Sequence, residues 1–429
     1  MGFMTSHRFR FLTLAAAAGL TAGGLSGCAN ESEDSAQQAP EDAQSASAPE
    51  SSHTLSPAAS GPECPEDSCI TMSVTGDLLL HHGLWDNFVT DPAAHDGQHF
   101  DFEPLLAGQR PYLENSDIGV CHAETPVAEQ GGPYADYPDF QVPPEIFSAV
   151  KSVGYDACTT ASNHTIDHGT ESLNRTVASL NEAGLQHTGS YESEATSEEP
   201  LLIHTEAGTV AIVTGTNSLN KKVPEHDWQV DRFRDGEDPT EDPAVAQADI
   251  DRAVDQANKA REQGADVVVA AMHSIIEYTD TADDFQVRTA HALADSGAFD
   301  AIYGHGSHSV QPIENHDGTW IVYGVGNTVT ETAPMMPSNN DGLIARFQFA
   351  KTENGNWDVS DLSWAPSSNT QGGQYAWCST ASDSPNGICR SEAEDTQNRE
   401  RIAQIVNTPS AVENGLREWL VSEDVPVKN

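Results

Sequence analysis

From about residue 70 the pattern of apolar and polar positions alternates between short apolar runs and longer stretches with a helical period. In four places a helical stretch ends in a glycine and an apolar run starts at once, at Gly154, Gly184, Gly264 and Gly297. Glycine just past a helix end takes the left-handed conformation that closes the last turn. The pattern therefore predicts a largely parallel α/β core in one domain, residues 70–350. The expected strands are Ile70–Thr75, Asp117–Cys121, Ala157–Thr160, Val210–Thr214, Asp266–Ala271, Phe299–Tyr303, Trp320–Tyr323 and Leu343–Phe349.

The segments on either side of this core have a different composition. Residues 29–69 begin with a long stretch of Ser, Ala, Pro, Glu and Gln, which cannot bury enough apolar surface to fold and predicts a disordered tether. Residues 351–429 form a C-terminal extension. Its first part, 351–394, is rich in Ser, Asn, Gly and Thr and favours loops, whereas Ile402 to Leu420 favours one or two short amphipathic helices.

The N-terminus has the features of a secretory signal over residues 1–28. Basic residues precede an apolar run from Phe11 to Leu20, and Leu25-Ser26-Gly27-Cys28 follows. This ending resembles the lipobox of bacterial lipoproteins. The resemblance implies that Cys28 becomes the acylated first residue of the mature chain and anchors it on the outer face of the cell membrane. The alternative is an ordinary secreted protein with an unmodified Cys28.

The cysteine count fits export. Seven cysteines are present, and six remain once Cys28 is set aside. In an oxidising compartment three disulfides are expected, although six cysteines allow fifteen connectivities. Two buried free thiols remain the alternative for Cys121 and Cys158, which lie on separate expected strands. The other four lie close together in pairs, Cys64 with Cys69 and Cys378 with Cys389.

The chain is strongly acidic. It carries 66 acidic and 20 basic residues, a formal net charge of −46. This excludes nucleic acid as a partner, because binding phosphates requires clustered Lys and Arg. An anionic substrate would need a local positive charge, which a bound divalent metal supplies.

Candidate ligands follow the expected strands, at the point where each strand ends. Carboxyl ends of parallel strands converge on one crevice, so these side chains are expected to meet there. Carboxylates, an asparagine carbonyl and imidazoles make the mixed oxygen and nitrogen set of a two-metal hydrolytic site. The clusters are Gly76-Asp77, Cys121-His122-Ala123-Glu124, Asn163-His164-Thr165-Ile166-Asp167, Met272-His273, Gly304-His305-Gly306-Ser307-His308 and Gly326-Asn327.

Asn163 and His164 form the most specific pair. The Asn163 carbonyl suits a metal, while His164 stays free for proton transfer and Asp167 holds its imidazole in one tautomer. The alternative is helix capping by Asn163 with an exposed His164.

Other assignments of single residues stay open. Asp77 is either a ligand or the cap of the next helix, and Glu124 is either a ligand or a surface carboxylate. His81 and His82 are further nitrogen donors one helical turn beyond Asp77, and His122 alternates with Glu124 and is able to face the same side. A serine hydrolase is disfavoured because no nucleophile-elbow sequence surrounds Ser162 or Ser307.

These motifs together resemble the capsule-synthesis CapA family (poly-γ-glutamate capsule biosynthesis), related to the calcineurin-like metallophosphoesterases. Where the family usually has Asn-Leu before the glutamate, this chain has His122-Ala123. The matching stretches, in family order over about 70–330, are Thr75-Gly76-Asp77, Glu124-Thr125-Pro126, Ser162 to Gly169, His273 with Glu277-Tyr278, Gly304 to His308 with Gln311-Pro312-Ile313-Glu314, and Tyr323 to Asn327.

The resemblance implies a four-layer αββα sandwich of metallophosphatase type, with one or two divalent ions (Mn, Zn or Fe) at the sheet ends. It implies His164 as the acid near the leaving group. It also implies the ligand positions Asp77, Glu124, Asn163, His273, His305 and His308.

The function implied by the resemblance is the synthesis, attachment or release of a poly-γ-glutamate-type capsule or cell-envelope polymer, by metal-dependent hydrolysis or transfer. The expected partners are the anionic polymer, the membrane through the lipid, and a capsule-synthesis complex. The alternatives are a non-catalytic polymer-binding component of a capsule export complex and a metallophosphoesterase acting on an envelope phosphoester.

Overall fold

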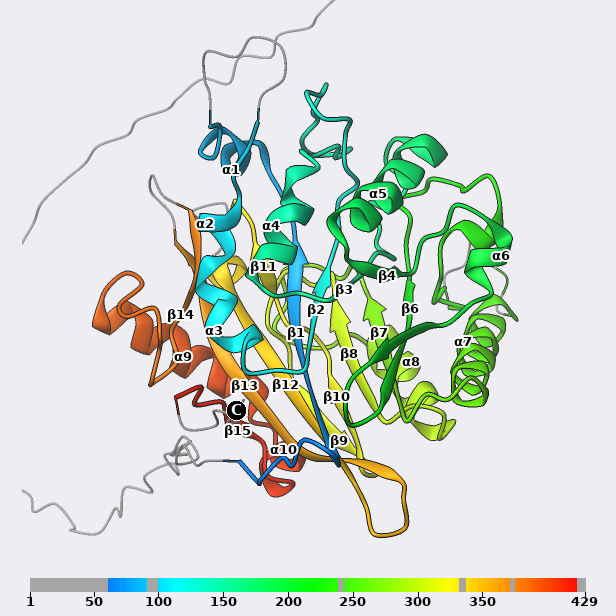
Figure 1. Cartoon of the computed structure of the whole chain (residues 1–429), viewed down its shortest axis with the longest axis vertical. Helices are drawn as coiled ribbons and strands as arrows, with labels where there is room; N and C mark the ends of the chain where they lie inside the picture. The colour runs from blue at the N-terminus through cyan, green and yellow to red at the C-terminus, as the bar shows by residue number, and fades with distance from the viewer. Residues whose placement is uncertain are drawn as a thin grey trace, which may run out of the picture. The chain divides into compact units, whose positions relative to one another are not determined.

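The structure is a computed structural model of the 429-residue chain, and it describes residues 61–90, 99–237, 242, 244–331, 337–370 and 375–422. The expected signal peptide with Cys28, and the tether as far as residue 60, lie outside the described residues. Within these ranges the chain is a mixed α/β protein with two mixed sheets (Figure 1). No helix in the described part is both long and apolar enough to cross a membrane.

The larger sheet has nine strands, and its main path runs β14-β13-β12-β1-β2-β3-β4. The four strands from β1 to β4 are parallel, whereas β12 runs antiparallel to β1 and β13 antiparallel to β12. Two strands lie off this path, β11 against β1 and β15 against β13. The strands are β1 (Cys69–Leu78), β2 (Ile118–His122), β3 (Ala157–Thr159), β4 (Gln186–Thr188), β11 (Asn327–Val329), β12 (Asp341–Lys351), β13 (Trp357–Thr370), β14 (Ala376–Ser379) and β15 (Arg417–Glu418).

The smaller sheet has six strands in the order β5-β6-β7-β8-β10-β9. Its four central strands are parallel, and the two edge strands β5 and β9 are antiparallel to their neighbours. The strands are β5 (Leu201–His204), β6 (Thr209–Thr216), β7 (Val267–His273), β8 (Ala301–His305), β9 (Ile313–His316) and β10 (Thr319–Val322).

Side chains that alternate along the strands build separate cores on the two faces of each sheet. Val267 and Val269 of β7 join a cluster that also contains Met72 and Val120 of the larger sheet, so the two sheets pack face to face. Val268 faces the other way and packs with the helices of the smaller sheet. Strands buried on both faces explain the continuous apolar runs of the sequence.

Helices cover the outer face of each sheet. Phe147 of α4 packs with Cys121 and Cys158 of the larger sheet, and Leu293 of α8 packs with Ile302 of the smaller one. The helices are α1 (His82–Asp86), α2 (Glu103–Leu106), α3 (Arg110–Leu113), α4 (Glu145–Val153), α5 (Gly169–Ala183), α6 (Glu194–Ser197), α7 (Ala244–Glu262), α8 (Asp284–Asp295), α9 (Glu392–Val406) and α10 (Pro409–Glu413), with 3₁₀ turns η1 (Ala107–Gln109), η2 (Asp227–Gln229) and η3 (Pro337–Asn340).

The eight expected strands correspond to β1, β2, β3, β6, β7, β8, β10 and β12. The four glycines after helical stretches all have positive φ, from 69° at Gly297 to 116° at Gly154. The centres of both sheets are parallel as expected. The antiparallel strands lie toward the sheet edges and make both sheets mixed.

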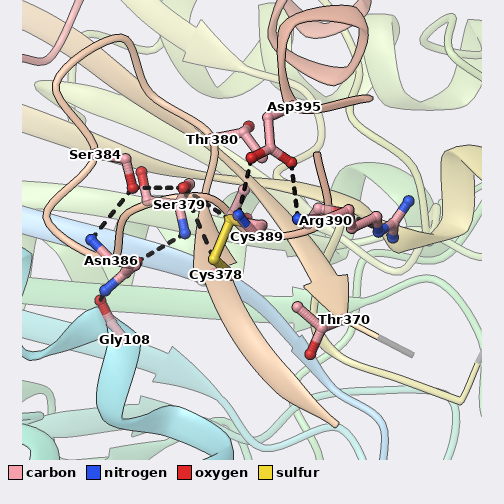
Figure 2. Close-up of a disulfide and its surroundings, with 12 residues drawn as sticks. Gly108, Thr370, Cys378, Ser379, Thr380, Ser384, Asn386, Cys389, Arg390 and Asp395 are labelled. Carbon is pink, nitrogen blue, oxygen red and sulfur yellow. Dashed lines mark hydrogen bonds between the residues drawn. A yellow bond between two sulfur atoms is a disulfide. The ribbon is translucent and has the colours of Figure 1, made fainter. Parts of the chain in front are cut away.

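The segment 351–394 differs from the expected loops, because it contains the long strand β13 and the short strand β14. Trp364 of β13 is buried in the cluster between the sheets. This packing stabilises the strand, although the polar composition of the segment did not predict one. The disulfide Cys378–Cys389 joins β14 to the loop before α9 (Figure 2), and the Asp395 carboxylate accepts the backbone N–H groups of Cys389 and Arg390 beside it.

All three expected disulfides are present. Their Cα–Cα distances are 5.2 Å, 4.5 Å and 5.8 Å for Cys64–Cys69, Cys121–Cys158 and Cys378–Cys389. Cys121 and Cys158 are paired in register on the adjacent parallel strands β2 and β3. The alternative of two buried free thiols is therefore wrong.

Candidate metal centre

The carboxyl ends of both sheets bring the candidate ligands together. In the larger sheet Asp77 is in register with His122 on one side and with Asn327 on the other. In the smaller sheet His273 is in register with His305. The parallel direction of these strands thus places one polar side chain after another at the same edge, as the strand-end pattern predicts.

Asp77 lies at the centre of the cluster and is fully buried. Its Oδ2 lies 3.1 Å from His308 Nδ1, and its Oδ1 lies 3.7 Å from His305 Nδ1. The backbone N–H of Gly306 also donates to the carboxylate. Asp77 belongs to β1, and α1 begins only at His82, so the alternative role as a helix cap is wrong.

A chain of side chains crosses from the larger sheet to the smaller one. His122 Nδ1 lies 2.8 Å from Thr159 Oγ1, and His122 Nε2 lies 2.9 Å from His273 Nδ1. His273 Nε2 then lies 2.9 Å from Asn163 Oδ1. The His305 ring stacks on His122 at 4.2 Å between centroids, which brings a third imidazole into contact.

Glu124 is the second buried carboxylate, 1% exposed, so it is not a surface turn residue. Its Oε1 lies 3.6 Å from His308 Nε2. His308 has a positive φ of 51°, and its Nδ1 lies 3.0 Å from Asn327 Oδ1 as well as near Asp77. The two buried carboxylates therefore lie on opposite nitrogens of one imidazole.

Four buried atoms of this cluster lack a hydrogen-bond partner among the described residues: both carboxylate oxygens of Glu124 and both ring nitrogens of His305. Buried polar atoms are almost always satisfied, so such a concentration indicates a missing ligand. Within this cluster, two groups of residues have ligand atoms within 4.8 Å of one another, namely Asp77, His122 and His273, and Asp77, Glu124 and His308. These residues fit divalent metal ions in position, burial and donor chemistry.

Burial and charge set the protonation of the cluster. Burial lowers the pKa of His122 and His273 well below the usual value and that of His305 to about 4, so these imidazoles are neutral, as ligation requires. Burial also lowers the pKa of His308, but the charges of Glu124 and Asp77 outweigh it and raise that pKa to about 10. Burial raises the pKa of Glu124 well above its usual value, whereas His308 helps to lower the pKa of Asp77, so without a metal the His308 cation chiefly offsets Asp77.

His164 and Asp167 lie next to this cluster. His164 Nδ1 is 2.6 Å from Asp167 Oδ2, which also accepts the Phe140 backbone N–H. His164 is only 6% exposed, and α5 begins at Gly169, so the alternative of a capping Asn163 with an exposed His164 is wrong. The Ser162 hydroxyl accepts the backbone N–H of His164 and donates to the backbone carbonyl of Glu124, which ties the pair to the candidate ligands.

Three contributors were given no ligand or catalytic role from the sequence. His122 contacts His273, Asn327 contacts His308, and Glu277 Oε1 lies 3.9 Å from His308 Nε2. Two features of the sequence could have identified two of them: His122 alternates with Glu124, and Asn327 follows an apolar run. His81 instead lies 3.1 Å from Asp136, and His82 is exposed beside Asp86, so neither joins the groups named above.

Comparison with known proteins identifies the family. Residues 71–332 match the model of the family described as bacterial capsule synthesis protein PGA_cap. A probable polyglutamine synthesis accessory protein of Mycobacterium tuberculosis is 30% identical over 223 residues, which cover 51% of this chain and 57% of that relative. The PGA biosynthesis protein CapA of Bacillus subtilis is 24% identical over 298 residues, which cover 69% of this chain and 72% of CapA.

The chain therefore spans little more than half the length of its mycobacterial relative. Among solved structures, the calcineurin-like phosphoesterase YfkN from Bacillus subtilis is similar over 80% of this chain and 99% of that chain, with a TM-score of 0.40 and 14% identity. Since the family model matches more than half of the sequence, this chain belongs to the bacterial capsule synthesis protein family PGA_cap.

Proposed function

We propose that this chain is a CapA-like, metal-dependent hydrolase or transferase acting on a poly-γ-glutamate-type capsule or cell-envelope polymer. The observation that carries the proposal is the set of unpartnered buried atoms on Glu124 and His305, in contact with further carboxylates and imidazoles. A purely structural core would leave these atoms unsatisfied at a cost of about 1–3 kcal/mol each.

The ligands are proposed to form two adjacent groups that share Asp77. His122 and His273 supply nitrogens for one group, and Glu124 and His308 supply donors for the other. Asn163 and His305 complete the set. Such a mixed set suits Mn, Zn or Fe, and one or two bound ions would supply Lewis acidity and activate water for attack.

His164 is proposed to give a proton to the leaving group, with Asp167 as its positioning residue. If the Nδ1–H of His164 donates to Asp167 Oδ2, the ring is held in one orientation and its Nε2 is left to carry the transferred proton. The Phe140 ring packs perpendicular to the His164 ring, with 4.8 Å between the ring centroids, and restricts the imidazole further.

We further propose that the two sheets and their outer helices form the four-layer αββα sandwich of metallophosphatase type. A lipid on Cys28 would hold the domain at the extracytoplasmic face of the cell membrane, where the anionic polymer and a capsule-synthesis complex are the proposed partners. The three disulfides support an oxidising location.

Three alanine variants test the division between ligation and proton transfer. Asn163→Ala and His273→Ala should lose metal and turnover together, because both side chains are proposed as ligands. His164→Ala should keep its metal while turnover falls by about 10²–10⁴-fold, the usual contribution of a positioned general acid. His204→Ala, which removes an exposed histidine on β5, is the matched control and should change neither quantity.

Metal content is measured by elemental analysis of protein purified without chelators. Turnover is measured with poly-γ-glutamate and with a generic phosphodiester as substrates. Circular dichroism verifies that each variant is folded. Metal loss in His164→Ala as complete as in His273→Ala would show that the roles are assigned wrongly. A metal-free wild type without turnover would favour the non-catalytic polymer-binding component. Turnover confined to the phosphodiester would favour an envelope phosphoesterase.

A further inference from the structure

A second cluster of metal-capable side chains lies between α8 and the edge strand β9. His291 comes from α8, whereas Glu314 and His316 come from β9. Ile313 packs into the core between the sheets, so Glu314 projects from the opposite face of β9, and His316, two residues on, shares that face. His316 pairs with Thr319 at the start of β10, the strand end opposite to His273 and His305.

The donor atoms of the three residues converge. Glu314 Oε1 lies 3.3 Å from His291 Nε2 and 3.8 Å from His316 Nδ1, and all three ligand atoms lie within 4.8 Å of one another. Two ligands of a tetrahedral zinc ion, with bonds of about 2.0–2.1 Å, are roughly 3.3–3.4 Å apart. The separation of 3.3 Å between Glu314 and His291 matches that value, and the separation of 3.8 Å between Glu314 and His316 is longer.

Two neighbouring groups orient these donors. Asp295 Oδ1 lies 2.9 Å from His316 Nε2, so the carboxylate fixes the ring and leaves Nδ1 toward Glu314. The Tyr323 hydroxyl donates to Glu314 Oε2 at 2.6 Å. His291 Nε2 also lies 3.2 Å from that oxygen, so Glu314 faces His291 with both oxygens and His316 with Oε1. A carboxylate behind a ligating histidine is the usual outer partner in zinc sites.

The two imidazole rings stack beside Glu314. The centroids of His291 and His316 are 3.8 Å apart, with an interplanar angle of 16°. The side chains are 20% to 30% exposed, so an ion and a water ligand have access from solvent.

We propose that His291, Glu314 and His316 form a zinc site, separate from the buried centre, that links α8 to the edge of the smaller sheet. Water would fill the fourth position of the ion, because the three donors leave one side of a tetrahedron open. The site is independent of the proposed reaction and concerns the binding of a structural or regulatory ion.

The test uses the full chain, stripped with a chelator and then dialysed against buffered Zn²⁺. Zinc per chain is measured for the wild type and for the double variant His291→Gln/His316→Gln, which keeps polar side chains but loses both imidazoles. His204→Gln, which removes an exposed histidine on β5, is the matched control. We expect the double variant to bind one zinc fewer per chain than the wild type and the control.

Asp295→Asn provides a second test in case the double variant does not fold. Asp295 is largely exposed, and its loss as an outer partner should weaken zinc binding at this site by about 10–100-fold. Equal zinc content in the wild type and the folded double variant would overturn the site. An equal loss in His204→Gln would also overturn it, because zinc would then be bound by surface histidines in general. Unchanged zinc affinity in Asp295→Asn would overturn the geometry argued for His316.

Discussion

At Gly306 the backbone passes close to the candidate ligand His273. Its φ is +88°, and a Cβ at this position would lie 2.8 Å from His273 Nε2 and 2.7 Å from the Ser274 carbonyl oxygen. We expect Gly306→Ala to displace the His273 ring and to lower both metal retention and the free energy of unfolding. The backbone conformation alone costs about 1–2 kcal/mol for a residue with a Cβ.

Gly355→Ala separates the clash from the backbone strain. Gly355 also has a positive φ, +86°, but a Cβ there meets no atom of the described chain within 4 Å. Elemental analysis and denaturant unfolding of both variants check the prediction, and only Gly306→Ala should lose metal. Equal behaviour of the two variants would mean that the close contact with His273 has no consequence.

At the scale of single residues, strand-end position predicted which side chains meet but not how they are linked. Asp77, Glu124, His273, His305 and His308 do converge, because each follows a buried parallel strand. The central place of His122 depends on its register with Asp77 and on the distance between two sheets, and neither is encoded in local sequence. The ligand roles of these residues stay predictions.

At the scale of elements, apolar runs in the sequence predicted the strands that are buried on both faces. β7 is an uninterrupted apolar run followed by a histidine, and its limits were predicted to within two residues. β13 was missed because Ser, Asn and Pro occupy much of it, and its strand state depends on long antiparallel pairing with β12. Tertiary pairing of this kind overrides local propensity.

The Cys121–Cys158 disulfide links the adjacent strands β2 and β3. Its sequence separation is 37 residues, against 5 for Cys64–Cys69. The chain-entropy model then gives about 4 kcal/mol of stabilisation for the first bond and about 2 kcal/mol for the second. We expect Cys121→Ala/Cys158→Ala to lower the free energy of unfolding by more than Cys64→Ala/Cys69→Ala, measured by denaturant titration without reductant. Equal losses would show that loop length does not govern these bonds.

At the scale of the whole molecule, charge separates two possible causes of membrane association. The net charge of −46 opposes binding to an anionic membrane surface, where basic residues are what favours adsorption. Any stable attachment of this chain should therefore come from acyl chains on Cys28, and it should not weaken when salt screens surface charges.

Cys28→Ser tests this directly. The native protein should partition with membranes at both low and high salt, and mass spectrometry should find a mature chain that begins at an acylated Cys28. The serine variant should be released under both salt conditions, because its acidic surface offers no electrostatic substitute for the lipid. Ser35→Ala, in the expected tether after Cys28, is the matched control and should stay with the membrane. A serine variant that still partitioned fully with membranes at high salt would contradict the anchor.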